Sequence, residues 1–275
     1  MPADRDSALR ELLAFYQEAG ADTAIGEQPV DRLAEDAGSL PPPEPARSAP
    51  TAVRADRVEE RGLPPMPPAP VAPDAAVMAA RETARSAASL EELRAILDRF
   101  EGCALRTTAT QLVFADGNPS ARVMFVGEAP GRDEDLEGKP FVGRSGKLLD
   151  RMMAAIGLDR TSAYIANVVP WRPPGNRTPT PQESAICLPF TLRQIELANP
   201  DVLVCLGNPS TQTLLATKEG ITRTRGRWFI FHTGKREIRA MPTFHPAFLL
   251  RNPLSKRLAW RDFLAIKKVL AQARS

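Results

Sequence analysis

The stretch RVMFVGEAPGRDED, residues 122–135, decides the fold of this chain. Its first half is a short apolar run typical of a buried strand, and its second half is a loop rich in glycines and carboxylates. Gly127 and Gly131 let the backbone turn tightly and approach a ligand closely. A strand-like run followed by a polar loop recurs at residues 163–179 and 238–253. Three strands would therefore each end in a loop that carries functional groups.

Strand-like and helical runs alternate through the second half of the chain, which predicts an α/β fold with a parallel sheet covered on both faces. In such sheets the ligand site lies beyond the carboxyl ends of the strands, so the three loops should meet there. Ser89 and Glu92 form a capping box that opens a helix. Strands are expected at 122–126, 163–168, 202–206 and 238–244, and helices at 146–156, 181–198, 210–216 and 255–273.

The first 80 residues have a different composition. Within residues 1–20, apolar side chains at helical spacing (Leu9, Leu12, Leu13, Tyr16) predict a short amphipathic helix that needs a partner, on the domain or on another protein. Residues 21–80 are rich in Pro and Ala, with eleven prolines from Pro41 to Pro73, and we expect a disordered linker. The folded domain would then span residues 81–275.

Charge divides the chain into two halves. Residues 1–100 hold 11 Lys and Arg against 18 Asp and Glu, and residues 101–275 hold 25 against 15, so the second half is basic. A basic domain suggests a polyanionic partner such as nucleic acid, although a solvated surface explains it equally well. There is no apolar run of about 18 residues, so we expect no membrane partner. The N-terminal residues do not have the pattern of a signal peptide and three cysteines form no disulfide framework, so we expect a cytoplasmic protein, and we also expect a monomer.

Four residues of the three loops carry candidate chemistry. Glu128 suits orientation of a water or stabilisation of a cation, and a carboxylate-only Mg²⁺ site is the rival use. Phe141 is either core or a stacking face for a base. Asn167 either caps a turn or bonds the Watson–Crick edge of a pyrimidine. His245 is a candidate electrophile or acid–base group. Together they could hold one nucleobase and break the bond to its sugar.

The basic residues of the loops are candidates for phosphate contacts, which position DNA without reading its sequence. The proline-rich loop after residue 171 carries Arg172 and Arg177, together with Asn176, a candidate substrate contact. Further along the chain, Leu249 and Leu250 are either core or an apolar wedge for a base stack. The remaining candidates for phosphate contacts are Arg225, Arg251 and Lys256.

The motifs GEAPGRDED, GKPFVGRSGKLLDRM, NVVPWRPPGNRTP, LGNPS and HPAFLLRNP, in this order, resemble the uracil-DNA glycosylase superfamily. Within it they are similar to family 4, the iron–sulfur-containing type of bacteria and archaea. The resemblance covers residues 95–272. It implies a three-layer α/β/α sandwich around a four-stranded parallel sheet, and an enzyme that flips uracil out of DNA, single- or double-stranded, and hydrolyses its N-glycosidic bond to start base excision repair.

The resemblance also implies roles for single residues. Phe141 would stack on uracil, Asn167 would read its edge and the backbone of Ala129 would line the pocket. His245 would stabilise the negative charge on the departing base. Glu128 and Glu134 would orient the water or support the sugar cation, and residues 249–251 would enter the duplex. The inserted KRRIH loop of the covalent-trapping relatives is absent, so we expect turnover.

One family feature is missing from this sequence. Family 4 holds a [4Fe–4S] cluster with four cysteines, but Phe100 and Trp171 stand at two of those positions here. Cys103 and Cys187 match the other two, and Cys205 lies in an apolar run. Three cysteines cannot supply four-cysteine ligation, so we expect no cofactor and no metal.

Two other functions remain open on the sequence alone. A non-catalytic module on the same fold could bind damaged DNA and recruit partners through the N-terminal arm. A nucleotide-hydrolysing enzyme would act on free mononucleotides, which the basic residues and the leucine pair disfavour.

Overall fold

The computed structural model describes residues 73–272. These residues form a six-stranded sheet in the order β1-β3-β2-β4-β6-β5. The strands are β1 Asp116–Gly117, β2 Val123–Gly127, β3 Tyr164–Asn167, β4 Val202–Leu206, β5 Phe229–His232 and β6 Glu237–Thr243. The four central strands are parallel, as expected, but β1 and β5 add antiparallel edges that the sequence analysis did not predict as sheet members.

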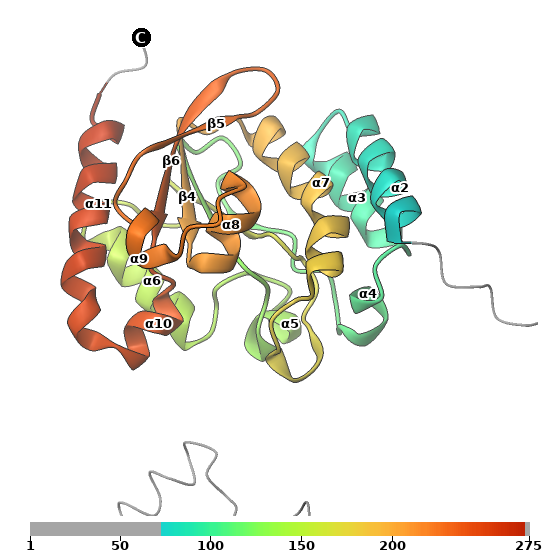
Figure 1. Ribbon diagram of the computed structural model, residues 1–275, viewed down its shortest axis with the longest axis horizontal. Coiled ribbons are helices and arrows are strands. Elements are labelled where there is room, and N and C mark those ends of the chain that lie inside the picture. The colour runs from blue at the N-terminus through green and yellow to red at the C-terminus, as the bar shows by residue number, and fades with distance from the viewer. Residues whose placement is uncertain (1–72, 273–275) are drawn as a thin grey trace, which may run out of the picture. The chain divides into compact units, whose positions relative to one another are not determined.

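Helices cover both faces of the sheet, which gives the expected three layers (Figure 1). The strand residues divide by alternation, since Met124 and Val126 pack toward one face and Val123 and Phe125 toward the other. The first face lies under α2 Pro73–Ser86, α3 Leu90–Arg99 and α7 Pro181–Ala198, and the second lies under α6 Arg144–Ala154 and α11 Lys256–Leu270.

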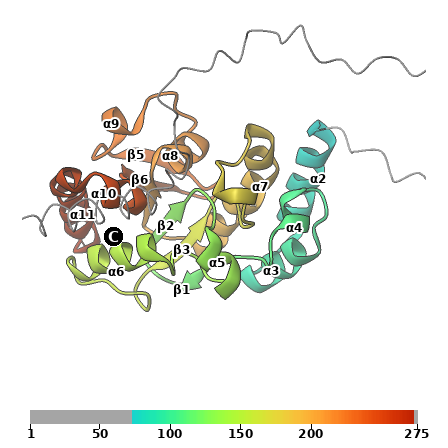
Figure 2. The ribbon, with the colours of Figure 1, turned by 90° about the horizontal axis from the view of Figure 1, so that it is seen from below.

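Shorter elements complete the domain. They are α4 Leu105–Thr108, α5 Arg132–Glu137, η1 Pro174–Asn176, α8 Asn208–Leu215, α9 Ile221–Thr224, α10 Pro246–Arg251 and η2 Pro253–Ser255. Seen from below in Figure 2, α5, α6 and α10 surround the carboxyl ends of the parallel strands. No helix among residues 73–272 is long and apolar enough to cross a membrane.

The boundary that we placed at residue 81 is too late. Helix α2 begins at Pro73, and its alanines Ala76, Ala80 and Ala84 are buried at four-residue spacing in the cluster that includes α7. Alanine contributes little apolar area, so by composition a helix face formed by alanines looks like part of the Pro- and Ala-rich linker. The helix predicted within residues 1–20 and the linker up to residue 72 lie outside the described residues, and the expected protein partner of that helix stays a prediction.

Candidate functional site: a pocket at the carboxyl ends of the strands

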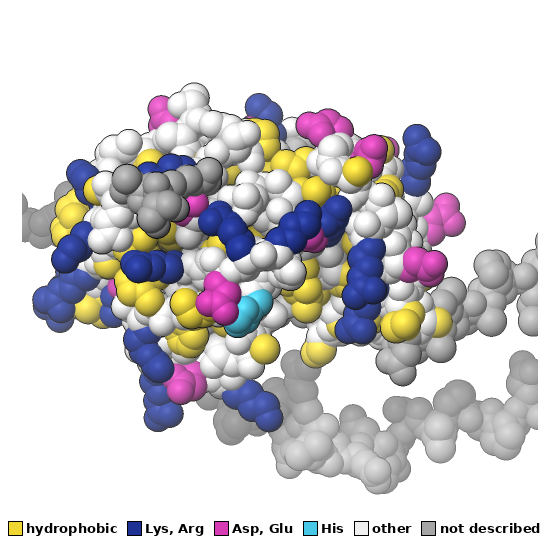
Figure 3. Space-filling model, turned by 90° about the horizontal axis from the view of Figure 1, so that it is seen from above, with side chains coloured by type: hydrophobic (Ala, Val, Ile, Leu, Met, Phe, Trp, Pro, Cys, Tyr) yellow, Lys and Arg dark blue, Asp and Glu magenta, His cyan; other side chains and the backbone are white. Residues whose placement is uncertain are grey.

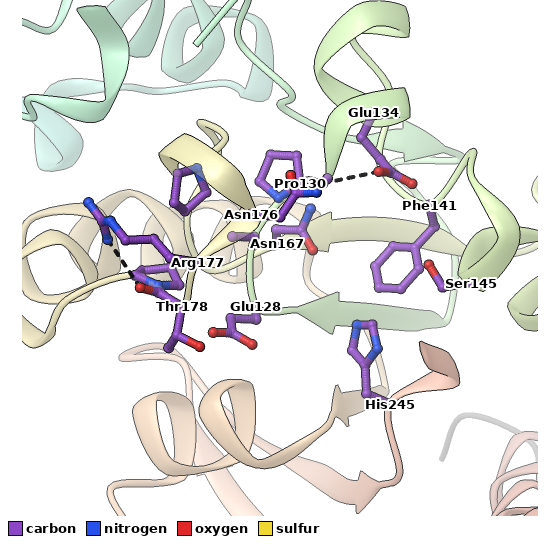
Figure 4. A pocket seen from close by; sticks show the side chains of 14 residues that line it. Glu128, Pro130, Glu134, Phe141, Ser145, Asn167, Asn176, Arg177, Thr178 and His245 are labelled. Atoms are coloured by element: carbon purple, nitrogen blue, oxygen red, sulfur yellow. Dashed lines mark hydrogen bonds between the residues drawn. The ribbon is translucent and has the colours of Figure 1, made fainter. Parts of the chain in front are cut away.

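The loops after β2, β3 and β6 meet in one pocket, as the parallel sheet requires. Its volume is about 200 Å³, below the roughly 300–1,000 Å³ typical of drug-sized ligand sites, which suits a single small ring. Figure 4 shows Glu128, Phe141, Asn167 and His245 converging on it from separate elements. The wall consists of Glu128, Ala129, Pro130, Gly131, Glu134, Phe141, Ser145, Asn167, Pro173, Asn176, Arg177, Thr178, Pro179 and His245.

Among residues 73–272, two buried side-chain atoms have no hydrogen-bond partner, and both belong to residues that line this pocket. They are Nδ2 of Asn167 and Oε1 of Glu128. A buried polar atom without a partner costs about 1–3 kcal/mol, so such atoms are rare unless a ligand satisfies them. Both residues line the same pocket, so an acceptor at Asn167 Nδ2 and a donor at Glu128 Oε1, from a ligand or a water, would satisfy these atoms.

Burial raises the pKa of the Glu128 carboxyl, and a hydrogen bond with Thr178 opposes that rise. The carboxylate is therefore a stronger base than an exposed glutamate. This property suits a group that takes a proton from water at near-neutral pH.

The pocket depends on a glycine at the end of β2. Gly127 pairs with Asn167 in the register of β2 and β3. A Cβ atom at Gly127 would lie 2.5 Å from Oδ1 of Asn167 and 2.6 Å from Cζ of Phe141. Any side chain at residue 127 would therefore displace the amide and the ring together.

Phe141 forms a flat wall of the pocket. Its ring lies 5.5 Å from the His245 ring, centroid to centroid, with 33° between the planes. Its backbone is in the left-handed region at φ 56°, which costs a bulky residue about 1–3 kcal/mol. Such strain persists only where the surrounding structure enforces it, and it is common at functional sites.

The orientation of His245 defines which nitrogen faces the ligand. His245 caps α10, and its Nδ1 accepts the N–H of Ala247 at 3.1 Å. The proton of the neutral ring is then on Nε2, which donates. Burial, with a smaller contribution from the positive charge of Arg251, lowers the pKa of His245 to about 4. The ring is therefore a neutral hydrogen-bond donor at physiological pH.

Glu134 lies at the pocket, but its oxygens are occupied. Oε2 accepts the N–H of Gly131 at 3.0 Å, and Oε1 accepts those of Val142 at 3.0 Å and Gly143 at 2.9 Å. The carboxylate thus ties the loop after β2 to the loop before α6. We therefore revise our assignment of Glu134 from a catalytic to a supporting role, and Glu128 remains the candidate that orients water.

Two of the expected DNA contacts are not available. Arg225 is paired with buried Asp262 and donates to the carbonyl of Leu258. Leu249 is 1% exposed and belongs to the core beside α11, whereas Leu250 is 38% exposed. Helix α10 explains the difference, because adjacent helical residues point in different directions.

The remaining basic candidates have different surroundings. Arg177 pairs with Glu183 at 2.7 Å, and Nε of Arg172 donates to Oδ1 of Asn176 at 2.7 Å, which holds Asn176 at the pocket rim. Lys256 lines a separate apolar hollow between α6 and α11. Arg251 lines a hollow that adjoins the pocket.

A second hollow of about 490 Å³ adjoins the pocket and shares Gly131, Glu134, Ser145 and Asn176 with it. Its basic groups are Arg132, Arg144 and Arg251, none of which has a carboxylate partner among residues 73–272. Its acidic groups are Asp133 and Glu134, and the oxygens of Glu134 accept backbone hydrogen bonds. We call this hollow the arginine groove. Arg132 and Arg144 were not among the expected phosphate contacts, although both lie inside the motifs GEAPGRDED and GKPFVGRSGKLLDRM.

Aromatic residues stand at two of the four positions where the sequence resemblance to family 4 implies cluster cysteines. The ring of Phe100 packs edge-on against Phe190 with centroids 4.9 Å apart, and Trp171 is 2% exposed. The sulfur atoms of Cys103 and Cys187 are 4.0 Å apart in the same apolar core. Within the described part of the chain, no group of three or more His, Cys, Asp or Glu residues could hold a metal ion.

Comparison with known proteins agrees with this fold and pocket. The family described as Uracil DNA glycosylase superfamily matches residues 114–264, more than half of the chain, and the chain belongs to that superfamily. Similar curated proteins are named Type-4 uracil-DNA glycosylase. That of Thermotoga maritima is 46% identical over 167 residues, 59% of this chain and 85% of the relative. Those of Sulfurisphaera tokodaii and Archaeoglobus fulgidus are each 40% identical, over 66% and 65% of this chain and 84% and 92% of the relatives.

Proposed function

We propose that this chain is a uracil-DNA glycosylase, which releases uracil from DNA by hydrolysis and leaves an abasic site. The observation that carries the proposal is a pair of buried atoms without a hydrogen-bond partner among the described residues, Asn167 Nδ2 and Glu128 Oε1, in one pocket that the rings of Phe141 and His245 also line. Family membership and the type-4 relatives support the same activity.

The amide of Asn167 can distinguish uracil from cytosine. Uracil offers a carbonyl acceptor beside an N–H donor, so Nδ2 donates to the former and Oδ1 accepts from the latter. Cytosine presents the opposite pair, an amino donor beside a ring acceptor. With cytosine, Nδ2 would face the amino donor and Oδ1 the ring acceptor, so the amide and the base would both lose their hydrogen bonds. The pocket therefore rejects cytosine.

Bond cleavage develops positive charge on the sugar and negative charge on the departing base. Nε2–H of His245 donates to an oxygen of that base, and a neutral donor stabilises the anion without protonating it. Glu128 positions a water and takes its proton as the water oxygen bonds to the anomeric carbon. Glu128 then releases the proton that it accepted and the uracil anion takes one up, so the products are free uracil and an abasic sugar.

DNA is the partner that the arginine groove fits best. Arg132, Arg144 and Arg251 would hold the phosphates that flank the flipped nucleotide, and exposed Leu250 would fill the space that the base leaves. On the side where the β5–β6 hairpin turns, Lys and Arg side chains are dispersed among acidic and apolar ones (Figure 3). The groove is therefore the better site for a polyanion.

We also propose that the enzyme works without an iron–sulfur cluster. Two of the four ligand positions are the aromatic residues Phe100 and Trp171, and their packing supports this proposal. The mechanism above uses only side chains of the pocket.

The proposed function is tested by mixing the full chain with a labelled strand that contains one uracil, free or in a duplex, and with the same strand carrying thymine. Hot alkali cleaves the strand at an abasic site, so breakage at uracil alone is the expected result. Binding of uracil DNA without release of uracil would favour the non-catalytic module instead. Turnover of free dUMP without action on DNA would favour a nucleotide hydrolase.

A further inference from the structure

The backbone of Phe141 needs an external restraint. Among the described residues, four non-glycine residues have positive φ, and Phe141 is the only aromatic one of them. A relaxed backbone at this position would redirect the ring away from the pocket, because φ sets the direction of the Cα–Cβ bond. The restraint must act on the peptides on either side of Phe141.

Arg160, in the loop between α6 and β3, contacts both of these peptides. One terminal nitrogen donates to the carbonyl oxygen of Phe141, and the other donates to that of Pro140 at 3.1 Å. The guanidinium is itself held by Asp116 at 2.6 Å and Asp150 at 3.0 Å. These carboxylates come from β1 and α6, so two elements of the fold hold one arginine.

The start of α6 closes the other side of the same peptide. A Cβ atom at Gly146 would overlap the carbonyl group of Phe141. The Phe141 peptide is thus confined between the backbone of Gly146 and the guanidinium of Arg160. Arg160 does not line the base pocket.

We propose that Arg160 is a positioning residue for uracil recognition. It holds the Phe141 peptide in the left-handed conformation and so keeps the aromatic ring parallel to a bound base. The role rests on the proposed function and extends it, since Arg160 touches neither the base nor the reacting atoms. Its two carboxylate partners neutralise its charge, which separates it from the arginines that bind phosphate.

The test compares Arg160 with Arg122, because each of them pairs with a carboxylate and donates to two backbone carbonyls. Arg122 pairs with Asp201 at 2.6 Å and donates to the carbonyls of Leu270 at 2.6 Å and Gln272 at 2.9 Å, away from the pocket. Arg160→Gln should lower kcat/KM for uracil release by about ten- to a hundredfold, the range expected for lost base stacking. Arg122→Gln should lose comparable thermal stability and keep kcat/KM within about twofold of the unmodified chain.

A double-mutant cycle shows whether Arg160 acts through Phe141. In a Phe141→Ala background, Arg160→Gln should change kcat/KM by less than about twofold, because the ring that it positions is gone. The inhibition constant of free uracil should rise in Arg160→Gln and should be unaffected by Arg122→Gln. If Arg160→Gln does not fold, Arg160→Lys keeps a charge between the carboxylates but cannot also supply both carbonyl bonds, and the same losses are expected.

The proposal is wrong if the Arg160 variants retain full activity, if Arg122→Gln is equally impaired, or if the effect of Arg160→Gln persists undiminished without Phe141. These outcomes are read only where the unmodified chain releases uracil. Absence of release by the unmodified chain would instead overturn the proposed function, so the two failures are distinct.

Discussion

Gly127 and Asn167 are paired in two adjacent parallel strands, and a Cβ atom at Gly127 would clash with the Asn167 amide, 2.5 Å from its Oδ1. The sheet register thereby places a glycine opposite the proposed uracil-reading residue. The same pattern recurs at the end of β4, where a Cβ at Gly207 would lie 2.9 Å from Cβ of His245. Because the glycines at these two strand ends have no side chain, there is space for the side chains of Asn167, Phe141 and His245.

Gly127→Ala should therefore lower kcat/KM for uracil release by about a hundredfold, the effect of misplacing reacting groups by about 1 Å. The chain should still fold, since the added methyl displaces pocket side chains and leaves the strand pairing in place. Gly220→Ala is the matched control, because nothing lies within 4 Å of the added atom there. Single-turnover assays of both variants decide the matter, and equal activity of the two would remove Gly127 from this role.

The lowered pKa of His245 predicts how rate and stability depend on pH. With a pKa of about 4, the ring is already neutral at pH 6, so the rate should stay constant between about pH 6 and 8. If catalysis required the protonated imidazolium, the rate would instead fall over this range. Because the pKa in the unfolded chain is near 6.5, the unfolded state binds the proton first on acidification. His245 therefore destabilises the fold progressively from about pH 6.5 down to about pH 4.

NMR titration of the imidazole signals checks this directly. The chain has two histidines, so His232→Gln leaves one ring to follow. Urea unfolding of the chain with and without His245→Gln, at several pH values, gives the stability difference. A midpoint for His245 near its ordinary value, or a rate that declines above pH 6, would contradict a neutral donor.

Much of the fold follows from local sequence signals. The bounds expected for β4 and α7 are confirmed, because an all-apolar run defines the strand and the capping box of Thr180 and Glu183 defines the helix start. Helix α5 was missed because RDEDLE has no apolar face, and its buried carboxylates, Glu134 and Asp135, accept hydrogen bonds from distant loops. Such partners are set by the tertiary structure and leave no periodic pattern.

The site residues divide in the same way. The loops identified from motifs do converge. The hydrogen-bond partners and the burial of single side chains could not be predicted, because they depend on residues that are distant in the sequence. Arg225 was expected at phosphate, but its partner Asp262 lies on α11, 37 residues later. The choice between Leu249 and Leu250 required knowing that α10 is a helix. Sequence spacing alone does not report such pairings.

The arginine groove predicts a change in salt dependence. Arg132→Ala and Arg144→Ala should each weaken DNA binding and reduce the slope of log K against log salt by about 0.7 on single strands or 0.9 on duplex. Arg227→Ala, which removes an exposed arginine paired with Glu219 at 2.9 Å, should leave that slope unchanged. Fluorescence anisotropy with a uracil-DNA analogue that cannot be cleaved measures the salt dependence of all three variants. If Arg132→Ala and Arg144→Ala have the same slope as the unmodified chain, phosphate contacts at the groove are excluded.

The last prediction concerns iron. The unmodified chain, purified anaerobically, should contain no stoichiometric iron and should show no absorption band at about 400 nm. The reason is that only Cys103 and Cys187 remain of the four thiolates that a [4Fe–4S] cluster needs. Iron analysis and an optical spectrum measure this. About four irons per chain would refute the proposal and would require two ligands from groups other than Phe100 and Trp171, such as carboxylates.

A gain of metal gives the sharper comparison. Phe100→Cys with Trp171→Cys restores four cysteines at the family positions, and this variant should acquire iron and the visible band when iron and sulfide are supplied. Phe100→Ser with Trp171→Ser creates the same space without thiolates and should stay colourless. The serine variant should also lose stability, since removing a buried aromatic side chain costs roughly 3–5 kcal/mol, whereas a bound cluster would refill that space. Iron in both variants, or in neither, would mean that the aromatic residues are not what excludes the cluster.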